Sequence, residues 1–350
     1  MAQKSYYVAR LRFLSGLHLA LDRDGNYDVS DDRLRSDTLL SALYACALEL
    51  ELARPGEQTF FNRYRLSSAF PFYLPDGSHQ PVYFFPRPLE PNLNLVFDKP
   101  GPDDRKRKAR VEYFDKALFE RIIAGKQATL SDNSLSKNKR LAASHSIADL
   151  KIFDNASFQH VASNEWDIAR EPEPYYVDKL FFEENCGLFF LIECAQEDVK
   201  DMQACLRLLA DNGIGTDRSS GNGAFEWTSE DWDTLQLEVP DNPAGRWMAL
   251  SLFIPKTEKD MGVLGQAAYE LTKRGGYISS STDEDYALLT IRKKSVYAFE
   301  EGSMLQCDDA PEGQIVDLRP NESLLNNKEQ KTALHPVYRS GRALFIPTAL

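Results

Sequence analysis

The chain has 350 residues, and its 41 Lys and Arg residues against 53 Asp and Glu residues give a formal net charge of −12 at pH 7. This balance argues against a protein that holds nucleic acid through an overall positive charge. With 43% hydrophobic and 27% charged residues, the composition is that of a folded globular chain. The length predicts about two domains, at roughly 100–200 residues each.

The five cysteines are scattered and include no C-x-x-C pair. Neither a disulfide framework nor a zinc ribbon is therefore predicted, and a reducing compartment fits this usage best. Charged residues interrupt the first 13 positions, and the strongest apolar run, Cys186 to Ile192, is too short to span a bilayer. We expect a cytoplasmic protein with neither a signal peptide nor a membrane segment.

The N-terminal part predicts a strand, a helix and a series of extended segments. Residues 5–21 combine period-two alternation with aromatic residues, a pattern typical of a strand. Ser36 is expected to cap a helix of about four turns, because apolar residues follow at helical spacing from Leu39 to Leu50. Aromatic and proline residues alternate over 60–91, which favours edge strands and loops.

The middle of the chain divides sharply by charge. Residues 101–140 contain 11 basic and 6 acidic residues, a net charge of +5 that leaves −17 for the remainder, and a short helix is expected over 113–123. Residues 151–201 reverse the sign, with 12 acidic against 4 basic residues. Within and after them, the apolar pattern predicts two strands over 175–193 and a helix over about 197–211.

Proline and glycine residues at 240–245 mark a boundary between two units. Before it, the order of elements is compatible with an elaborated βαββαβ ferredoxin-like fold. After it, we expect a strand over 247–254 and a helix over 263–273. Further strands are expected over residues 287–291, 295–299, 315–318 and 344–346.

The predicted fold class is therefore α+β with two ferredoxin-like (RRM-like) domains. The first spans residues 1–240, with a basic insertion at about 98–150 and a glycine-rich loop at 213–223. The second, smaller domain spans residues 246–350 and is expected to be ferredoxin-like or a degenerate α+β unit.

The densest signal is the glycine-rich stretch GIGTDRSSGNGAF at residues 213–225, where 4 of the 19 glycines fall within 11 residues. A helix C-cap followed by a turn would explain part of this pattern. A ligand-binding loop is favoured over a simple turn because the stretch also contains Arg218, Ser219 and Ser220. Glycines let a backbone approach a phosphate, successive N–H groups can form an anion nest, and these side chains add charge-assisted hydrogen bonds. A phosphodiester chain is the expected ligand.

Other ligand motifs are excluded. No Lys-Ser/Thr pair ends the loop, and the loop follows a helix where a dinucleotide fingerprint follows a strand, so ATP and NAD are not expected. Residues 22–28 look like a calcium loop, but Tyr27 and Arg33 occupy the positions of its glycine and glutamate. The histidines show no metal-ligand spacing. We therefore expect no cofactor and no metal.

The loop sequence GIGTDRSSGNGAFEW, placed after a helix, resembles the signature of the RAMP superfamily of CRISPR RNA-binding proteins. Further segments narrow the resemblance to the family of fourth subunits of the type III-A (Csm) effector complex. These segments are SGLHLA, SDTLLSALYACAL, AFPFYLP, FFPRPLEP, RVEYFDKALFERIIAGK, YYVDKLFFEENCGLFFLIE and HPVYRSGRALFIP, and they extend from His18 to Pro347. Thr216-Asp217 departs from the family, which often has glycine and a basic residue there, so the charge of the loop depends on Arg218.

The resemblance implies a non-catalytic RNA-binding subunit that holds the 5′ tag of the crRNA. Its implied partners are the crRNA, the large polymerase/cyclase-domain subunit and the adjacent backbone RAMP subunit. Phosphate contacts from the loop would fix the register of the tag, and Phe13 and Phe225 are candidates for stacking on its bases. The RNA-binding residues expected on this basis are Arg10, Arg12, His18, Gly213, Gly215, Arg218, Ser219, Ser220, Gly221 and Gly223. The basic segment 101–140 resembles the thumb-type hairpin of the family, although a solvated run of charge explains it equally well.

Two alternatives remain. Some RAMP proteins cut precursor crRNA without a metal, and His18 is the one histidine placed where an imidazole could act as a general base. A single histidine near a strand end is more often structural, so we expect no enzyme. The other alternative is an interaction protein without RNA of its own. The helix face that begins at Asp37-Thr38 and the acidic region 151–201 are then the expected docking surfaces for the large subunit.

Overall fold

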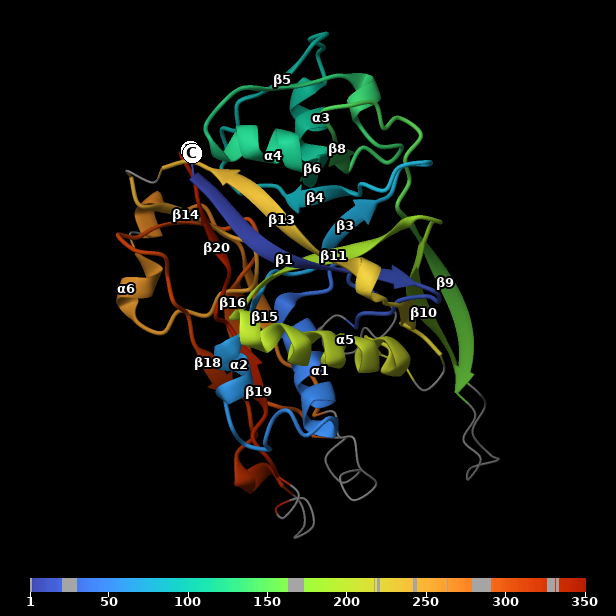
Figure 1. Cartoon of the computed structure of the whole chain (residues 1–350), viewed down its shortest axis with the longest axis vertical. Coiled ribbons are helices and arrows are strands. Elements are labelled where there is room, and N and C mark those ends of the chain that lie inside the picture. Colours follow the sequence, from blue (N-terminus) through green and yellow to red (C-terminus); the bar gives the residue numbers. More distant parts are fainter. Residues whose placement is uncertain are drawn as a thin grey trace.

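The computed structural model describes residues 2–20, 30–162, 173–216, 218, 221–241, 244–262, 264–278, 291–325, 331 and 334–350. In Figure 1 a large sheet crosses the middle of the molecule, with α1 (Ser36–Glu49) and α5 (Val199–Asn212) below it. Residues 98–150 form a lobe above the sheet. The C-terminal strands, coloured orange to red, lie on one side, and a ribbon of β9 (Phe153–Ala162) and β10 (Glu173–Phe182) lies on the other.

The centre of the sheet is built around β1 (Ala2–Phe13), the strand predicted from the start of the chain. It pairs antiparallel with both β13 (Trp232–Val239) and β11 (Cys186–Glu193), and β11 pairs antiparallel with β3 (Phe70–Tyr73). The central order is therefore β13-β1-β11-β3. Within the described residues the whole sheet has nine strands, and its β6–β8 pair is parallel. The remaining strands of this sheet are β2 (Arg65–Leu66), β4 (Val82–Pro86), β6 (Tyr113–Asp115), β8 (Leu141–Ala142) and β12 (Phe225–Glu226).

The alternation along β1 separates two hydrophobic layers. Ala9 and Leu11 face the helices and share a core with Leu39 and Leu43 of α1 and with the apolar face of α5. Val8 points to the opposite face of the sheet, where the lobe above the sheet and part of the C-terminal segment cover it. Since successive side chains of a strand point to opposite faces, the sequence of β1 supplies both layers.

The helix α1 confirms the predicted amphipathic helix, but the role expected for Ser36 is wrong. Ser36 is the first helical residue, and Arg35, at the N-cap, makes no side-chain capping bond. The Ser36 hydroxyl oxygen instead accepts a hydrogen bond from the Leu252 N–H at 3.1 Å. The hydroxyl that the sequence assigned to capping therefore joins the N-terminal and C-terminal parts of the chain.

The segment 98–150 adds β6 and β8 to the edge of the sheet and forms a lobe beside them, and the thumb-type hairpin expected there stays a prediction. Asp115 caps α4 by accepting a hydrogen bond from the Leu118 N–H at 2.9 Å, so the expected helix begins three residues later than predicted. Phe119 of α4 stacks on Phe85 of the sheet at 4.7 Å, which fixes the lobe on the sheet. The lobe and the strand leading into it contain β5 (Leu95–Phe97), α3 (Asp104–Arg110), α4 (Lys116–Ile123), β7 (Ala128–Leu130) and η1 (Asp132–Ser134).

The C-terminal segment consists of short strands. A three-stranded sheet has the order β17-β14-β20, and two further antiparallel pairs are β15–β16 and β18–β19. The strands are β14 (Arg246–Ala249), β15 (Leu271–Arg274), β16 (Val296–Phe299), β17 (Met304–Gln306), β18 (Ile315–Asp317), β19 (Tyr338–Ser340) and β20 (Phe345–Pro347). The short helices of the chain are α2 (Thr59–Arg63), η2 (Gln196–Asp198), η4 (Ser229–Asp231), α6 (Glu258–Met261), η5 (Leu264–Gln266) and η7 (Glu322–Leu324).

The helix predicted over 263–273 is wrong. Residues 264–266 form a single 3₁₀ turn, and residues 271–274 form β15. Pairing with β16 decides this, because it places Thr272 opposite the buried Ala298. The strands predicted near 296, 315 and 345 are present as β16, β18 and β20, whereas residues 287–290 of the predicted strand 287–291 lie outside the described residues. No helix in the described part of the chain is long and apolar enough to cross a membrane.

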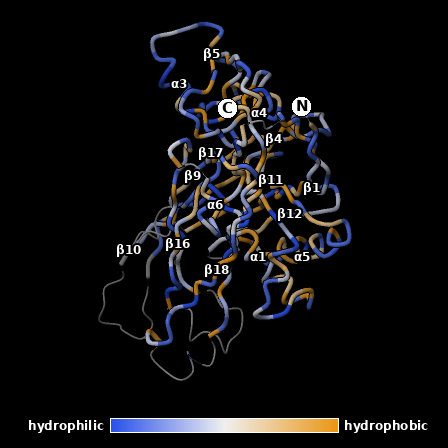
Figure 2. Tube along the Cα trace, turned by 90° about the vertical axis from the view of Figure 1, so that its left-hand side faces the viewer, coloured by the Kyte–Doolittle hydropathy of each residue, from blue (hydrophilic) through white to orange (hydrophobic). Residues whose placement is uncertain are grey.

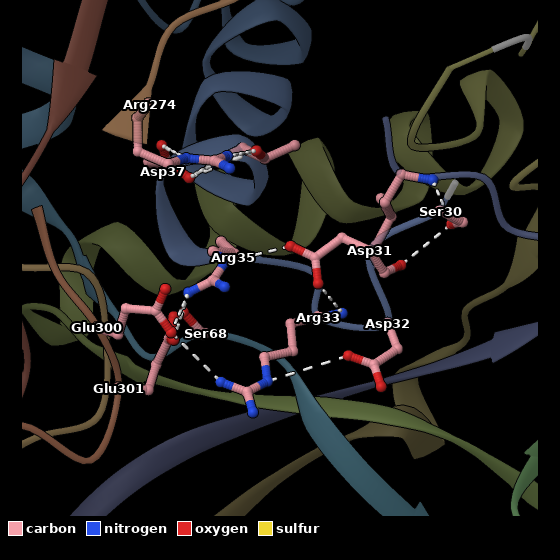
Figure 3. Close-up of polar contacts among 12 residues, drawn as sticks. Ser30, Asp31, Asp32, Arg33, Arg35, Asp37, Ser68, Arg274, Glu300 and Glu301 are labelled. Carbon is pink, nitrogen blue, oxygen red and sulfur yellow. Dashed lines mark hydrogen bonds and ion pairs between the residues drawn. The ribbon is translucent and has the colours of Figure 1, made fainter. Parts of the chain in front are cut away.

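A buried cluster of charges joins α1 to the C-terminal segment (Figure 3). Asp37, at the start of α1, is 1% exposed and bonds to the Nε of Arg274 at 2.9 Å and to the guanidinium of Arg339. Beside it, Arg35 bonds to Glu301 at 3.0 Å. Burial alone would raise the pKa of the Asp37 carboxyl, but the charges of Arg274 and Arg339 lower it well below its usual range. Asp37 is therefore ionised and fully paired, which excludes it from the docking surface expected at Asp37-Thr38.

We expect Asp37→Ala to lower the free energy of unfolding by about 3–5 kcal/mol, because it leaves two buried guanidinium groups without their carboxylate. Urea denaturation at pH 7 measures this loss. Asp154→Ala is the matched control, since Asp154 is an exposed carboxylate paired with Lys151, and a surface pair contributes at most about 1 kcal/mol. Similar losses in the two variants would contradict a central role for Asp37.

Comparing the native chain with Asp37→Ala at different pH values also tests the pKa of the Asp37 carboxyl. A carboxyl whose pKa is lower in the folded chain than in the unfolded chain stabilises the fold fully above the unfolded value, near about pH 4. That stabilisation is lost as the pH falls through the folded value. The difference in unfolding free energy between the native chain and Asp37→Ala should therefore be constant from pH 8 to pH 5 and shrink below about pH 4.

Candidate functional site

The glycine-rich loop connects the end of α5 to β12 and lies across the end of β1. Gly213 ends α5 with a positive φ of 71°, and its N–H donates to the Leu209 carbonyl at 2.8 Å. This is the helix C-cap that the simpler interpretation of the glycines required. The rest of the loop then contacts residues 14–18, which follow β1.

Three N–H groups at the base of the loop are bonded within the chain, and the anion nest stays a prediction, because residues 217, 219 and 220 lie outside the described residues. The Ile214 N–H donates to the Gly223 carbonyl at 3.0 Å, the Thr216 N–H to the His18 carbonyl at 3.0 Å, and the Gly223 N–H to the Gly16 carbonyl at 2.9 Å. The sequence could not reveal the bonds to Gly16 and His18, because these two acceptors lie about 200 residues away from their donors along the chain. The loop backbone is used to hold the loop against the end of β1.

Two of the glycines are required by close packing. A Cβ on Gly223 would lie 1.8 Å from the Ile214 carbonyl oxygen, and a Cβ on Gly215 would lie 2.5 Å from the His18 carbonyl oxygen. Both residues have positive φ, at 70° and 100°. Gly221 also has a positive φ, 79°, but a Cβ there would meet no atom within 4 Å. Gly213, Gly215 and Gly223 therefore shape the base of the loop, and Gly221 lies at its open tip.

Arg218 is exposed at this tip, and its carbonyl accepts a hydrogen bond from the Gly221 N–H at 2.9 Å. Ser219 and Ser220 lie outside the described residues. Among the described residues of the loop, Arg218 and Gly221 are exposed at its tip.

His18 connects the loop to the β9–β10 ribbon. Its side chain is 3% exposed, and its Nδ1 lies 2.7 Å from the carbonyl oxygen of Asp178 in β10. Its own carbonyl accepts hydrogen bonds from both the N–H and the hydroxyl of Thr216, at 3.0 and 3.2 Å. Through these hydrogen bonds the buried His18 holds the loop and the ribbon beside each other.

Arg10 and Arg12 lie on β1 and are compensated within the chain. The Nε of Arg10 lies 3.6 Å from Asp231, and the same carboxylate bonds to Arg12 at 2.9 Å. Arg12 also pairs with Glu226 at 3.2 Å. Burial would lower the pKa of Arg12, but the bond to Asp231 and the charges of both acids raise it overall. These two arginines therefore contribute little uncompensated positive charge to the candidate site.

Phe13 and Phe225, the aromatic residues expected to stack on bases, are used in packing. Phe13 stacks on Phe182 with ring centroids 4.9 Å apart, and Phe225 is buried. The structure brings Phe13 to the loop, because Phe13 pairs with Phe225 in the β1–β12 ladder. Phe13 is partly buried and Phe225 is buried in this packing, and their stacking on bases stays a prediction.

Exposed aromatic rings occur instead on the β9–β10 ribbon, which the sequence analysis did not select. Phe158, Tyr175, Tyr176 and Phe181 are between 38% and 50% exposed, and the Lys179 ammonium lies 5.2 Å from the centre of the Phe158 ring. Leu180 of the ribbon exchanges two backbone hydrogen bonds of 2.8 Å with Leu17. The run of aromatic residues in YYVDKLFF is visible in the sequence, but only the strand pairing shows that this segment lies beside the loop.

The described residues contain no cluster of His, Cys, Asp or Glu side chains that could hold a metal ion.

The chain is similar to known proteins over most of its length. Residues 242–348 match the family model for the CRISPR Csm4 C-terminal domain. The CRISPR system Cms protein Csm4 of Mycobacterium tuberculosis H37Rv is 26% identical over 312 residues, which cover 89% of this chain and 88% of that protein. The protein of the same name from Methanocaldococcus jannaschii is 27% identical over 305 residues, covering 76% and 78% of the two chains.

Solved structures with the same fold include a chain of a Csm3-Csm4 subcomplex of the type III-A CRISPR-Cas interference complex, with a TM-score of 0.59 and 18% identity. A chain of a Csm1-Csm4 cassette in complex with pppApA has a TM-score of 0.58 and 17% identity. Each comparison covers 99% of this chain and at least 99% of the other.

The contrast between Gly223 and Gly221 gives a test of the loop geometry. Gly223→Ala should lower the free energy of unfolding by about 2–5 kcal/mol, because it adds overpacking to backbone strain. Gly221→Ala should cost only about 1–2 kcal/mol, because strain acts alone there. Urea denaturation of both variants measures the difference, and equal losses would contradict the packing of Gly223 against Ile214.

Proposed function

We propose that this chain, which is similar in sequence and in fold to Csm4 proteins of CRISPR systems, is the RNA-binding subunit that links the large Csm1 subunit to the Csm3 filament in a type III-A effector complex. The observation that carries this proposal is the similarity to Csm4 over nearly the whole chain, both in sequence and in fold. The structural neighbours were solved as a Csm1-Csm4 cassette and as a Csm3-Csm4 subcomplex, and the same two partners are proposed for this chain.

Two ferredoxin-like domains are part of this proposal. The central order β13-β1-β11-β3 and the placement of α1 and α5 on one face support a ferredoxin-like unit in residues 1–240, with residues 98–150 inserted. The family match to residues 242–348 supports a separate C-terminal domain, proposed as residues 246–350. That domain is proposed to be a degenerate α+β unit, because its described strands are short and fall into small sheets.

The 5′ tag of the crRNA is proposed to lie across the loop tip and the β9–β10 ribbon. Arg218, Ser219, Ser220 and Gly221 would contact its phosphates, and the exposed rings of the ribbon would stack on its bases. The hydrogen bonds of His18 support this arrangement, because they hold the loop and the ribbon together. Arg12, whose side chain is 40% exposed, would contribute at the margin, next to the largely buried Arg10.

Gly213, Gly215 and Gly223 would act on RNA indirectly, by fixing the shape of the loop. The N–H groups of Gly213 and Gly223 and the tight packing of Gly215 and Gly223 serve the fold, so substitution of these glycines should weaken RNA binding through the loop conformation.

Arg218→Ala combined with Gly221→Asp should weaken binding of 5′-tagged crRNA by about 10- to 100-fold. The double variant removes one charge-assisted contact and adds a negative charge, and one such contact contributes about 1.5–3 kcal/mol. Asp tolerates a positive φ, so the turn should be retained. Fluorescence anisotropy with a tagged crRNA measures the affinity.

Arg54→Ala combined with Gly77→Asp is the matched control for this experiment. Arg54 is highly exposed, and Gly77 has a φ of 72° with no atom within 4 Å of a built Cβ. This control makes the same chemical change elsewhere on the surface and should bind tagged crRNA like the native chain. Unchanged binding by the Arg218 and Gly221 double variant would contradict the proposal that the loop tip binds the crRNA tag.

A cytoplasmic, non-catalytic role completes the proposal. The burial of His18 and its bond to the Asp178 carbonyl support a positioning role rather than general-base catalysis. We expect precursor crRNA to stay intact when it is incubated with the purified chain in EDTA, as followed on a denaturing gel. Cleavage by the native chain that disappears in His18→Ala would overturn this assignment.

A further inference from the structure

The lobe formed by residues 98–150 carries a strongly basic surface that the proposed tag site does not use. Its centre is the helix α3, of sequence DRKRKAR. Figure 2 shows the trace around α3 as hydrophilic, at the end of the molecule away from α1 and α5. The lobe packs on the opposite face of the central sheet from α5, which leads into the glycine-rich loop.

Arg107 is the cation of α3 that anchors the helix. Its guanidinium carbon lies 3.6 Å from the centre of the Phe97 ring, and the guanidinium bonds to Asp104 at 2.9 Å and to Asp132. Arg107 faces the lobe, whereas Arg105, Lys106 and Arg110 are exposed to solvent. α3 buries none of its residues.

The outward cations have little acidic compensation. Arg105 and Arg110 have no acidic partner within the described residues, and Lys106 lies 3.7 Å from Asp103 with both side chains largely exposed. Lys106 and Arg110 are also four residues apart, so like charges adjoin on one face of the helix, which is destabilising for an isolated helix. A bound polyanion would remove this repulsion.

A second segment extends the same surface. The N–H groups of Glu112 and Tyr113, just after α3, donate to the Arg140 carbonyl at 2.8 and 3.1 Å. These bonds bring the turn that contains Lys137 and Lys139 beside the C-terminal end of α3. Both lysines are exposed and have no acidic partner within the residues that the structure describes. Arg140 itself pairs with Asp32 and Glu112 and faces inward.

We propose that the α3 surface, made of Arg105, Lys106, Arg110, Lys137 and Lys139, binds the phosphate backbone of RNA as a second contact, separate from the glycine-rich loop. Protein interfaces bury an apolar centre, and the only apolar side chain on α3 is the methyl group of Ala109. Phosphate contacts need charge and flexible donors but no apolar centre and no base-reading group. The chemistry of this surface therefore fits a phosphodiester chain of any sequence better than an acidic protein.

The test measures the salt dependence of binding to an untagged, mixed-sequence single-stranded RNA of 20 nucleotides, by fluorescence anisotropy of the full chain between 50 and 300 mM KCl. Each phosphate contact to a single strand contributes about 0.7 to the slope of log K against log salt. Arg105→Ala, Lys106→Ala and Arg110→Ala together should reduce the magnitude of that slope by about 2.

The control removes three exposed cations elsewhere, as Arg54→Ala with Lys256→Ala and Lys259→Ala. It makes the same change in net charge and should leave the slope as in the native chain. Circular dichroism establishes that both variants are folded. Equal slopes in the native and α3 variants, equal reductions in the α3 and control variants, or no measurable RNA binding by the native chain at 50 mM KCl would each overturn the proposal.

This inference shares with the proposed function only the nature of the ligand, and the two can fail separately. The Arg218 and Gly221 double variant should keep the α3 contribution to the slope. Loss of that contribution in the double variant would place the contact at the loop and overturn the α3 proposal. If the α3 variant instead lost a protein partner while keeping its RNA slope, the surface would be a protein interface.

Discussion

The arrangement of the whole molecule depends on the buried ion pairs of Asp37 with Arg274 and Arg339. A carboxylate at the first turn of α1 is taken out of water and compensated by two guanidinium groups from the C-terminal segment. Breaking such a pair leaves an uncompensated buried charge, which strongly destabilises the contact between the two parts of the chain. Asp37 lies in the sequence SDTLLSAL and Arg339 in HPVYRSGRA. Two of the motifs that carry the family resemblance are therefore the two sides of one interaction.

Other contacts extend this junction in both directions. Arg342 donates to the carbonyls of Phe61 and Asn62 at 3.2 and 2.9 Å, and the Tyr338 hydroxyl donates to the Gly56 carbonyl at 2.7 Å. Met248 and Ile346 of the C-terminal sheet enter the same hydrophobic core as Val8 of β1. The junction fixes the C-terminal sheet relative to the central sheet. The role proposed for this chain, which is to join two different partners, requires such a fixed relation between its surfaces.

Charge in this protein is organised locally rather than overall. The net charge of −12 excludes general attraction to RNA, yet it averages an insertion of +5 with a remainder of −17. Pairing then decides which cations reach a ligand. Arg10 and Arg12 form ion pairs with Asp231 and Glu226, and Arg140 forms ion pairs with Asp32 and Glu112. Arg218 and the outward residues of α3, in contrast, are exposed. Fewer cations are therefore available to a ligand than the composition indicates.

The sequence by itself determined the elements whose signal is local. Three such features could be predicted: the alternation of β1, the apolar face of α1 and the turns at the glycines of the loop. The period of the hydrophobic pattern and the preference for a positive φ both depend on neighbouring residues. The tertiary structure decided everything that needed a distant partner. Pairing with β16 made residues 271–274 of the expected helix into β15, and the carbonyls of Gly16 and His18 accept hydrogen bonds from two N–H groups of the loop. Hydrogen bonds and ion pairs form between groups far apart in the chain, so their partners, and the side chains left free for function, follow only from the fold.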